Sequence, residues 1–314
     1  MNVSKPLIII TGPTASGKSA LALSLCPQFK GEIVNVDSAL IYKHLNIGSA
    51  KPSPAELNAV PHYLIDILEP EFAFSAGQFC SHAKEAIEII EKHQHTPFLV
   101  GGTMLYLKAL LYGLSALPTA SAEIRATIIK DAEKYGWATL HERLKQIDPQ
   151  AAARIHRNDP QRLQRALEIY YLTGQAPSDL FETPKQGLIQ ESHRVLTIAI
   201  APADRAVLHE RIAQRFDLML QQGFVEEVAA LKQNPVLHAT LPSMRTVGYR
   251  QVWQYLNGEY NYATMRDKAI AATRQLAKRQ LTWLRRWPDV HWFDPTENNF
   301  LTAVQECIQD FLDL

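Results

Sequence analysis

The stretch that decides the fold is Leu7-Ile8-Ile9-Ile10-Thr11-Gly12-Pro13-Thr14-Ala15-Ser16-Gly17-Lys18-Ser19. Its apolar first part, Leu7 to Thr11, predicts a buried strand, and the pattern from Lys18 to Leu25 predicts a helix. A buried strand, a glycine-bearing turn and a helix in this order are typical of the first unit of an α/β fold.

Residues 12–19 match the pattern G-x-x-x-x-G-K-[S/T] of a phosphate-binding loop, and the predicted strand and helix supply its usual context. The glycines let backbone N–H groups surround an anion, and the N-terminus of the helix adds positive potential. Lys18 supplies a full charge, and Ser19 can hold Mg²⁺ against the phosphates. The loop alone does not identify the phosphorylated compound.

Four further apolar runs predict strands of one parallel sheet: Glu32 to Val36, His62 to Ile67, Pro97 to Val100 and Val195 to Ile200. Parallel strands need crossover connections, and residues 75–93 have the apolar spacing of such a helix. We therefore expect an α/β core with a parallel sheet flanked by helices.

Between the last two of these strands the chain shows only helical patterns, from residue 121 to about residue 173. The clearest helix has Asp159 as its N-cap and Pro160 at its first position, and it stops at Gly174. A loop-rich stretch, 175–193, then leads back to the sheet. This order predicts an all-helical insertion domain over 119–193, within a core formed by 1–118 and 194–314. Beyond Pro202 we expect only helices, including 204–222 and about 262–287.

Composition narrows the class of protein. With 314 residues, 46% hydrophobic and 20% charged, the chain is expected to fold as a soluble globular protein. Its three cysteines and eleven histidines show no metal-ligand spacing, so we expect neither a disulfide framework nor a zinc site. The run from Leu7 to Ile10 is too short for a signal peptide or a membrane span. We expect a cytoplasmic monomer without membrane contact.

Two polar residues follow predicted strands at the edge where parallel sheets bind ligands. Asp37 follows the strand 32–36, and Thr103 follows Gly101-Gly102 after the strand 97–100. An aspartate there can position Mg²⁺, act as a general base, or simply cap the next helix. The glycine pair indicates a close approach of backbone to ligand.

Seven segments, in order, closely resemble those of the tRNA dimethylallyltransferase family, also called IPP transferases. They are GPTASGKS at 12–19, DSALIYK at 37–43, GSAKP at 48–52, GGTMLY at 101–106, NDPQR at 158–162, VGYRQ at 247–251 and TRQLAKRQ at 273–280. The resemblance extends from about residue 10 to residue 287. The chain has no counterpart of the C-terminal zinc-finger extension of eukaryotic members, so it resembles the bacterial type.

The resemblance implies a P-loop NTPase-like core with a helical insertion, and transfer of a dimethylallyl group to tRNA. The donor is dimethylallyl diphosphate, and the acceptor is N6 of the adenosine on the 3′ side of the anticodon. Mg²⁺ is the implied cofactor. The family's general base matches Asp37, and its diphosphate-binding positions match Thr103 and Arg215. The adenine amine needs such a base, because its lone pair is delocalised into the ring.

Charge along the chain fits an RNA partner although the total is zero. Residues 245–287 carry a net charge of +7, residues 1–100 a net charge of −2, and a second basic cluster lies at 154–165. Together with the resemblance, this predicts contacts with the anticodon stem-loop of tRNA by Asp37, Ser38, Ala39, Leu40, Thr103, Arg125, Gln161, Arg162, Leu163, Gln164, Arg165, Arg245, Thr246, Val247, Gly248, Tyr249, Arg250, Arg274, Lys278 and Arg279. We expect the tryptophans of the C-terminal part to be packing residues.

Two other classes of function remain open from the residues alone. A P-loop kinase of a small metabolite or nucleotide would explain the loop and Asp37, but it leaves the basic C-terminal helix without a purpose. A non-catalytic RNA binder switched by a nucleotide would bind ATP or GTP and form no product.

Overall fold

The computed structural model describes residues 4–113, 115, 117–180, 189 and 192–314. The chain divides into two compact units, Met1–Ala109 with Ile189–Leu314, and Leu110–Leu188. Each unit has a hydrophobic core of its own. Most of the loop expected between the last insertion helix and the returning strand lies outside the described residues.

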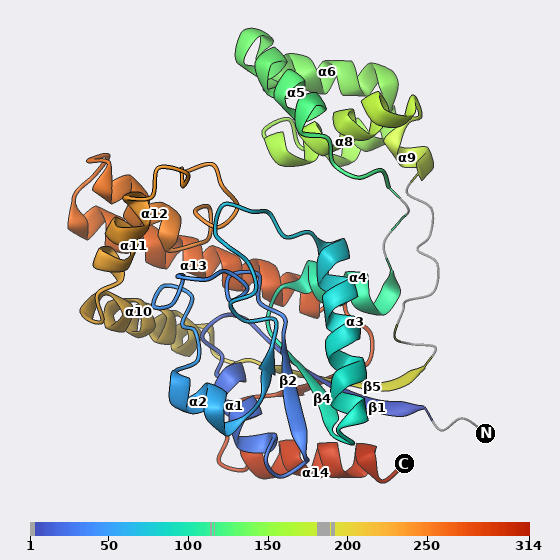
Figure 1. The fold of residues 1–314 in the computed structure, drawn as a ribbon, viewed down its shortest axis with the longest axis vertical. Helices are drawn as coiled ribbons and strands as arrows, with labels where there is room; N and C mark the ends of the chain where they lie inside the picture. Colours follow the sequence, from blue (N-terminus) through green and yellow to red (C-terminus); the bar gives the residue numbers. More distant parts are fainter. Residues whose placement is uncertain (1–3, 114, 116, 181–188, 190–191) are drawn as a thin grey trace. The chain divides into compact units, whose positions relative to one another are not determined.

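The first unit contains a six-stranded sheet of order β3-β2-β4-β1-β5-β6, with every pairing parallel (Figure 1). Its strands are β1 (Lys5–Thr11), β2 (Gly31–Asn35), β3 (His62–Tyr63), β4 (Thr96–Val100), β5 (His193–Ile200) and β6 (Val290–Phe293). The expected parallel α/β core is confirmed. From β1 the chain runs to β2 on one side of the sheet, and after β4 it crosses to β5 on the other side, which creates a crevice at the carboxyl ends of the central strands.

Nine helices in the described residues complete the first unit, counting α4, which runs on to Tyr112. They are α1 (Lys18–Leu25), α2 (Pro54–Ala59), α3 (Ala76–Lys92), α4 (Met104–Tyr112), α10 (Arg205–Gln221), α11 (Phe224–Lys232), α12 (Tyr249–Leu256), α13 (Tyr262–Leu284) and α14 (Phe300–Leu312). Ser75 caps α3 by accepting a hydrogen bond from the Gln78 N–H, while the Gln78 side chain bonds back to the Ser75 N–H. This capping box explains why the helix begins where the sequence predicted.

Two of the hydrophobic clusters among the described residues of the first unit position its helices on the sheet. One joins alternate residues of the strands, such as Ile8, Ile10 and Phe98, to the inner faces of α1 and α14. The other gathers α10 to α13 around Phe224 and Tyr249 and includes Ile41 from the segment after β2. Helix α3 packs on β2 and β4 and lies in front of the sheet in Figure 1. The C-terminal helices are thus anchored to the same end of the sheet as the loop after β2.

The described residues of the second unit form helices joined by loops, with no strand among them. It consists of α5 (Ala122–Tyr135), α6 (Trp137–Ile147), α7 (Pro149–Arg154), α8 (Pro160–Thr173) and α9 (Pro177–Leu180). The predicted boundaries of α8 are confirmed, because Asp159 caps its start and Gly174 follows in the left-handed conformation. Ile128, Leu144 and Leu167 are among the buried residues of its core.

Two expectations about strands need correction. The strand predicted over 62–67 is only two residues long, because Leu64 and Asp66 have positive φ and the chain turns to bond with Leu40 and Ile41. Strand β6 was not predicted at all. It pairs with β5 at the edge of the sheet, and its half-exposed residues lack the apolar run that marks a buried strand.

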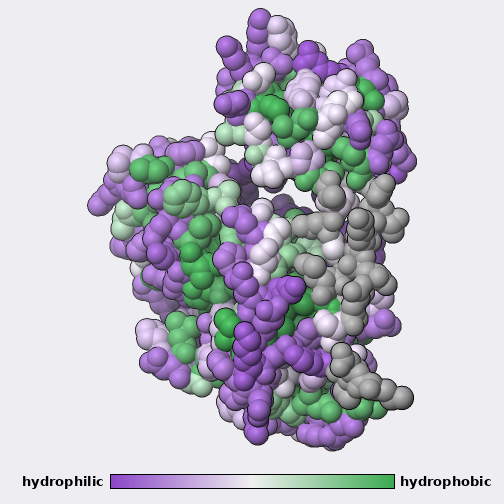
Figure 2. All heavy atoms as spheres, turned by 45° about the vertical axis from the view of Figure 1, so that its right-hand side comes forward, coloured by the Kyte–Doolittle hydropathy of each residue, from purple (hydrophilic) through white to green (hydrophobic). Residues whose placement is uncertain are grey.

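No helix of the described residues is long and apolar enough to cross a membrane. On the face drawn in Figure 2, hydrophilic side chains are interspersed with hydrophobic patches. All three cysteines are free, as expected.

One buried carboxylate organises the second unit. The side chain of Glu168 is completely buried, and it accepts hydrogen bonds from Arg125 at 2.9 Å and 3.2 Å and from Arg165 at 2.6 Å. It also accepts from the Ser121 N–H, at the start of α5. Burial by itself would raise the pKa of Glu168, but the two arginines and this N–H outweigh it, so the pKa lies below its ordinary value. The network fastens α5 to α8.

We expect Glu168→Gln to destabilise α5 and α8 by about 1–3 kcal/mol at pH 7, because the two arginines lose a buried charged partner. Since the pKa of Glu168 is depressed on folding, its contribution is present above the ordinary value of 4.5 and is lost as the pH falls through the folded pKa. Hydrogen exchange of the α5 and α8 amides measures the change. As a control, Glu142→Gln, at an exposed position of α6, should change the stability of α5 and α8 by less than about 0.5 kcal/mol. Equal exchange in wild type and Glu168→Gln at pH 7 would contradict the role of the network.

Candidate active site

A pocket of about 510 Å³ opens at the carboxyl ends of the central strands. Its walls come from the loops that follow β1, β2 and β4, from α10 and α13, and from the segment 242–248. All of these elements belong to the first unit. The position agrees with the rule that open parallel sheets bind ligands at this edge.

The phosphate-binding loop is shaped by two glycines. Gly12 has a φ of 149°, and a Cβ on it would lie 2.2 Å from the carbonyl oxygen of Ile200. Gly17 has a φ of 97° and precedes α1. Ser16 is fully buried between them, and its Oγ is the one buried side-chain oxygen or nitrogen of the described residues without a hydrogen-bond partner. Its free hydrogen-bonding capacity fits a loop built around an anion.

Gln280 of α13 holds this loop in place. Its Oε1 accepts from the Thr14 N–H at 2.8 Å, and its Nε2 donates to the Gly102 carbonyl at 3.0 Å. Gln280 is buried, so the two bonds are protected from water. One side chain therefore connects α13 with the loops after β1 and β4.

Asp37 stands two residues after the end of β2, and hydrogen bonds fix its backbone on both sides. Its N–H donates to Asn35 Oδ1 at 2.9 Å, and its own Oδ1 accepts from the Ala39 N–H at 2.9 Å. Asn35 in turn donates to the carbonyl groups of Asp37 and Leu64. These bonds leave the second carboxylate oxygen of Asp37 without a described protein partner, on a residue that lines the pocket.

Thr103 links the loop after β4 to the loop after β2. Its Oγ1 accepts from the Ser38 N–H at 3.0 Å, and its N–H donates to the Val36 carbonyl at 3.0 Å. Gly101 allows this contact, because a Cβ there would lie 2.3 Å from the backbone of Val36. The sequence prediction that these two loops meet at one edge is confirmed.

Two cations and one carboxylate share the floor of the pocket. Burial lowers the pKa of Lys18 to about 8, Asp37 opposes this shift, and Arg215 adds to it. Burial also lowers the pKa of Arg215, again against the attraction of Asp37. Lys18 Nζ donates to the Pro13 carbonyl at 2.7 Å. An anion bound here would gain two partly dehydrated positive charges.

The side of the pocket beneath α10 and α13 is apolar, and it is formed by Ile212, Phe216, Met219, Leu276 and Trp283. The expectation that Trp283 only packs between helices is therefore wrong: its residue is 40% exposed, and it lines the pocket. Lys108 Nζ lies 5.8 Å from the centre of its ring. Trp292 is also exposed, whereas Trp253 is buried as expected.

The structure brings many of the predicted site residues into this pocket, but not all. The pocket-lining ones are Thr14, Ala15, Lys18, Asp37, Ser38, Ala39, Thr103, Arg215, Arg245, Thr246, Val247, Gly248 and Arg279. Those of the first unit that do not line it are Gly12, Pro13, Ser16, Gly17, Ser19, Leu40, Tyr249, Arg250, Arg274 and Lys278. The others belong to the second unit: Arg125, Gln161, Arg162, Leu163, Gln164 and Arg165.

Two predicted RNA contacts do not fit the structure. Tyr249 and Leu163 have no exposed surface, because Tyr249 packs against Phe224 and Leu163 lies in the core of the second unit. A direct side-chain contact of either residue with tRNA is therefore wrong for this conformation. Both shape the elements that carry their exposed neighbours, such as Arg250 and Arg162.

Sequence reasoning missed two residues that build the site. One is Gln280, although it stands in the TRQLAKRQ segment. The other is Glu227, which accepts hydrogen bonds from the N–H groups of 46–48 at 3.0 Å, 2.7 Å and 3.3 Å and from the Tyr249 hydroxyl at 2.6 Å. This contact fixes Gly48 at the rim of the pocket. A glutamine within the basic TRQLAKRQ segment was the available signal for Gln280, and nothing local marked Glu227.

Comparison with known proteins gives a consistent result. The family model described as IPP transferase matches residues 40–287. A full-length tRNA isopentenylpyrophosphate transferase from Bacillus halodurans is 33% identical, with 98% of this chain and 97% of that chain covered and a TM-score of 0.72. A tRNA delta(2)-isopentenylpyrophosphate transferase from Staphylococcus epidermidis is 32% identical, with coverage of 98% and 99% and a TM-score of 0.68.

A third similar structure is a eukaryotic dimethylallyltransferase acting on tRNA. It is 28% identical and has a TM-score of 0.80, with 99% of this chain and 80% of that chain covered. The resemblance seen in the sequence motifs is thereby confirmed, and the kinase alternative is not favoured. The family model matches well over half of the residues, and it includes the strands and helices that carry Thr103, Arg215 and Gln280, so the chain belongs to the IPP transferase family.

Proposed function

We propose that this protein transfers a dimethylallyl group from dimethylallyl diphosphate to N6 of the adenosine on the 3′ side of the anticodon of tRNA. The observation that carries the proposal is a single pocket, in a member of the IPP transferase family, which combines an anion-binding loop, the carboxylate of Asp37 and an apolar wall. A prenyl diphosphate has two matching ends, an anionic diphosphate and an apolar hydrocarbon chain.

The diphosphate of the donor binds backbone N–H groups of residues 15–19 at the N-terminus of α1, since Pro13 has no N–H and the Thr14 N–H donates to Gln280. Lys18 and Arg215 supply positive charge, and the Thr103 hydroxyl can donate to a phosphate oxygen in place of its weak 3.4 Å contact with Ser38. The prenyl chain lies along the apolar wall formed by Ile212, Phe216 and Trp283. These three side chains exclude water from the reacting carbon.

In the transfer, N6 of the adenine attacks C1 of the dimethylallyl group, and the bond from C1 to the diphosphate oxygen breaks. The electron pair of that bond leaves with the diphosphate. Asp37 accepts the proton that N6 loses, through the carboxylate oxygen that the Ala39 N–H does not occupy. Lys18 and Arg215 stabilise the charge on the departing diphosphate.

Mg²⁺ fits this site, because hydroxyl, carboxylate and phosphate oxygens are its preferred ligands. Ser19, in the first turn of α1 next to Lys18, would hold it through Oγ together with the diphosphate oxygens. When bound, the ion neutralises charge on the leaving group.

The anticodon stem-loop binds exposed arginines and lysines of both units. In the first unit these are Arg245, Arg250, Arg274, Lys278 and Arg279, and Arg245 and Arg279 also line the pocket. We propose residues 119–193 as the insertion domain that contacts tRNA. Of its three candidate arginines, Arg162 has the most exposed side chain. The target adenine must leave its stack to reach Asp37, at a cost of a few kcal/mol that these contacts offset.

The direct test is to incubate the protein with Mg²⁺, dimethylallyl diphosphate and unmodified tRNA, and to examine the digested RNA by mass spectrometry. We expect N6-isopentenyladenosine, with one diphosphate released for each nucleoside modified. Phosphate transfer from ATP to a small molecule, with no prenylated nucleoside, would instead support the kinase alternative. Binding of a nucleotide and RNA without any product would support the switched binder.

Asp37→Asn should lower turnover by about a hundredfold or more, because the amide cannot accept the N6 proton. The Asn side chain keeps an oxygen for the Ala39 N–H, so the loop should keep its shape. Single-turnover rates with saturating tRNA measure the effect, and tRNA affinity should stay nearly unchanged. Normal turnover at saturating tRNA, with weakened tRNA binding, would remove Asp37 from the chemistry and assign it to binding.

The double variant Arg274→Glu and Lys278→Glu should weaken tRNA binding and flatten its dependence on salt, by about 0.7–0.9 in logarithmic slope for each phosphate that the protein no longer neutralises. Lys84→Glu with Lys92→Glu, both on exposed positions of α3, is the matched control, because it changes the net charge equally. Affinity measured between about 50 mM and 200 mM salt separates the two. Equal slopes in both double variants would remove this face of α13 from the interface.

A further inference from the structure

A second cluster of chemically active side chains lies at the other end of the sheet. Glu32, in β2, directs its Oε1 at Nδ1 of His93, 2.9 Å away, and at Nδ1 of His95, 2.6 Å away. Its Oε2 accepts from the Tyr63 hydroxyl at 2.7 Å. One atom from each of Glu32, His93 and His95 lies within 4.8 Å of the others.

The backbone at the end of α3 places His93 and His95 on the side that faces Glu32. Gln94 has a φ of 61°, its N–H donates to Glu91 at 2.9 Å, and the His95 N–H donates to Ile90 at 3.1 Å. These two bonds close the helix with a left-handed residue between His93 and His95. The pairing of Glu32 with Pro97 then brings β2 alongside.

Glu32 is the buried member of this cluster. Its side chain is only 3% exposed, and the ion pairs found for it among the described residues are with His93 and His95. Buried charges in proteins are paired or bound to metal ions, and an imidazole nitrogen is a common partner in either case.

We propose that Glu32, His93 and His95 bind one divalent transition-metal ion, Zn²⁺ by preference. Two imidazole nitrogens and one carboxylate oxygen are a common ligand set for zinc. The metal–ligand distances of about 2.0–2.2 Å require the three atoms to separate slightly from hydrogen-bond contact. The histidines can make this movement because their side chains are 50% and 40% exposed, and the same exposure leaves a fourth position to water.

Tyr63 has a positioning role in this site. Its hydroxyl holds the oxygen of Glu32 that does not face the histidines, which fixes the orientation of the ligand oxygen. Such supporting hydrogen bonds typically change metal affinity by about 10–100-fold. The bond also connects β3 with β2, so the ion would fasten β2, β3 and the end of α3 together.

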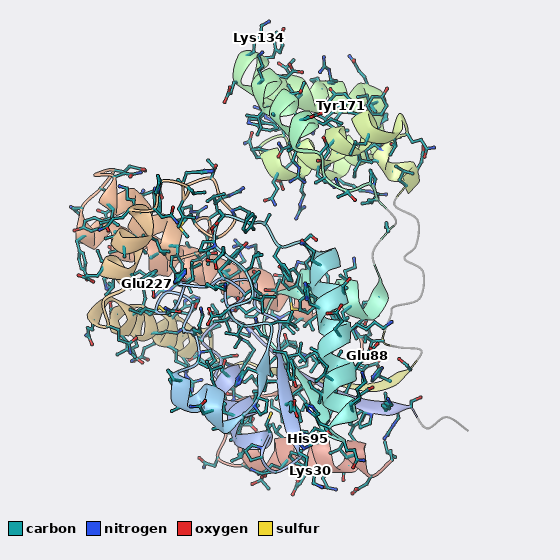
Figure 3. The ribbon with its side chains drawn as sticks, in the orientation of Figure 1. Lys30, Glu88, His95, Lys134, Tyr171 and Glu227 are labelled. Atoms are coloured by element: carbon teal, nitrogen blue, oxygen red, sulfur yellow. The ribbon has the colours of Figure 1, made fainter. Side chains whose placement is uncertain are left out.

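The proposed metal site is separate from the prenyl-transfer pocket. Glu32 lies at the amino end of β2, whereas Asp37 follows its carboxyl end. In Figure 3, His95 lies at the lower end of the sheet, and Glu227, which fixes the rim of the pocket, lies among the C-terminal helices. The two proposals can therefore fail independently.

The test is a titration of the metal-free protein with Co²⁺, observed by its visible absorption, followed by displacement with Zn²⁺. We expect one equivalent to bind to the wild type, and the affinity to fall by at least about a hundredfold in the His93→Ala/His95→Ala double variant. The matched control is His82→Ala/His291→Ala, which removes two exposed histidines from other positions of the same unit. This control should bind as tightly as the wild type.

Two further measurements test the role of Tyr63 and the effect of the metal on stability. Tyr63→Phe should bind Co²⁺ about 10–100-fold more weakly than the wild type, and Zn²⁺ should raise the melting temperature of the wild type but not of the double variant. Prenyl transfer by the correctly folded double variant should continue, which separates this proposal from the first. The proposal is overturned if the wild type binds no more tightly than the double variant, or if the control loses binding equally.

Discussion

Two hydrogen bonds from the side chain of Gln280 hold the active site in one arrangement. They fasten α13 to the Thr14 N–H in the phosphate-binding loop and to the Gly102 carbonyl after β4. Because Gln280 is buried, losing either bond would leave a dehydrated polar group unsatisfied. Gly102 makes the contact possible, since a Cβ there would lie 2.4 Å from Nε2 of Gln280. The position of the basic helix is thus coupled directly to the anion site.

The parts of the molecule that the sequence predicted correctly are those with local causes. The phosphate-binding loop needs its own glycines, and α8 begins and ends at its own cap residues, Asp159 and Gly174. The features that the sequence did not predict depend on distant partners. Strand β6 exists because β5 offers an edge, and the metal-binding group joins Glu32 to His93, 61 residues away. The sheet brings these residues together from distant parts of the sequence, so the spacing of residue types along the chain does not predict such contacts.

Arginines serve two different purposes in the two units. In the second unit, Arg125 and Arg165 both bond to the buried Glu168, so part of the basic cluster is committed to holding α5 against α8. In the first unit, Arg266 is likewise paired, with Asp217. Net charge along the sequence therefore overstates what is available to RNA. Exposed groups with no carboxylate partner among the described residues, such as Lys278, are the better guide to a phosphate-binding surface.

The charges of the active site oppose one another before any ligand arrives. Burial, together with the neighbouring Arg215, lowers the pKa of Lys18 to about 8, while Asp37 favours the charged form. One carboxylate does not offset two dehydrated cations, so folding leaves this edge with an excess of positive potential. An anion between Lys18 and Arg215 would relieve that excess and favour the protonated lysine again. Part of the affinity for a diphosphate is therefore already built into the fold, at a cost in stability that an active site commonly carries.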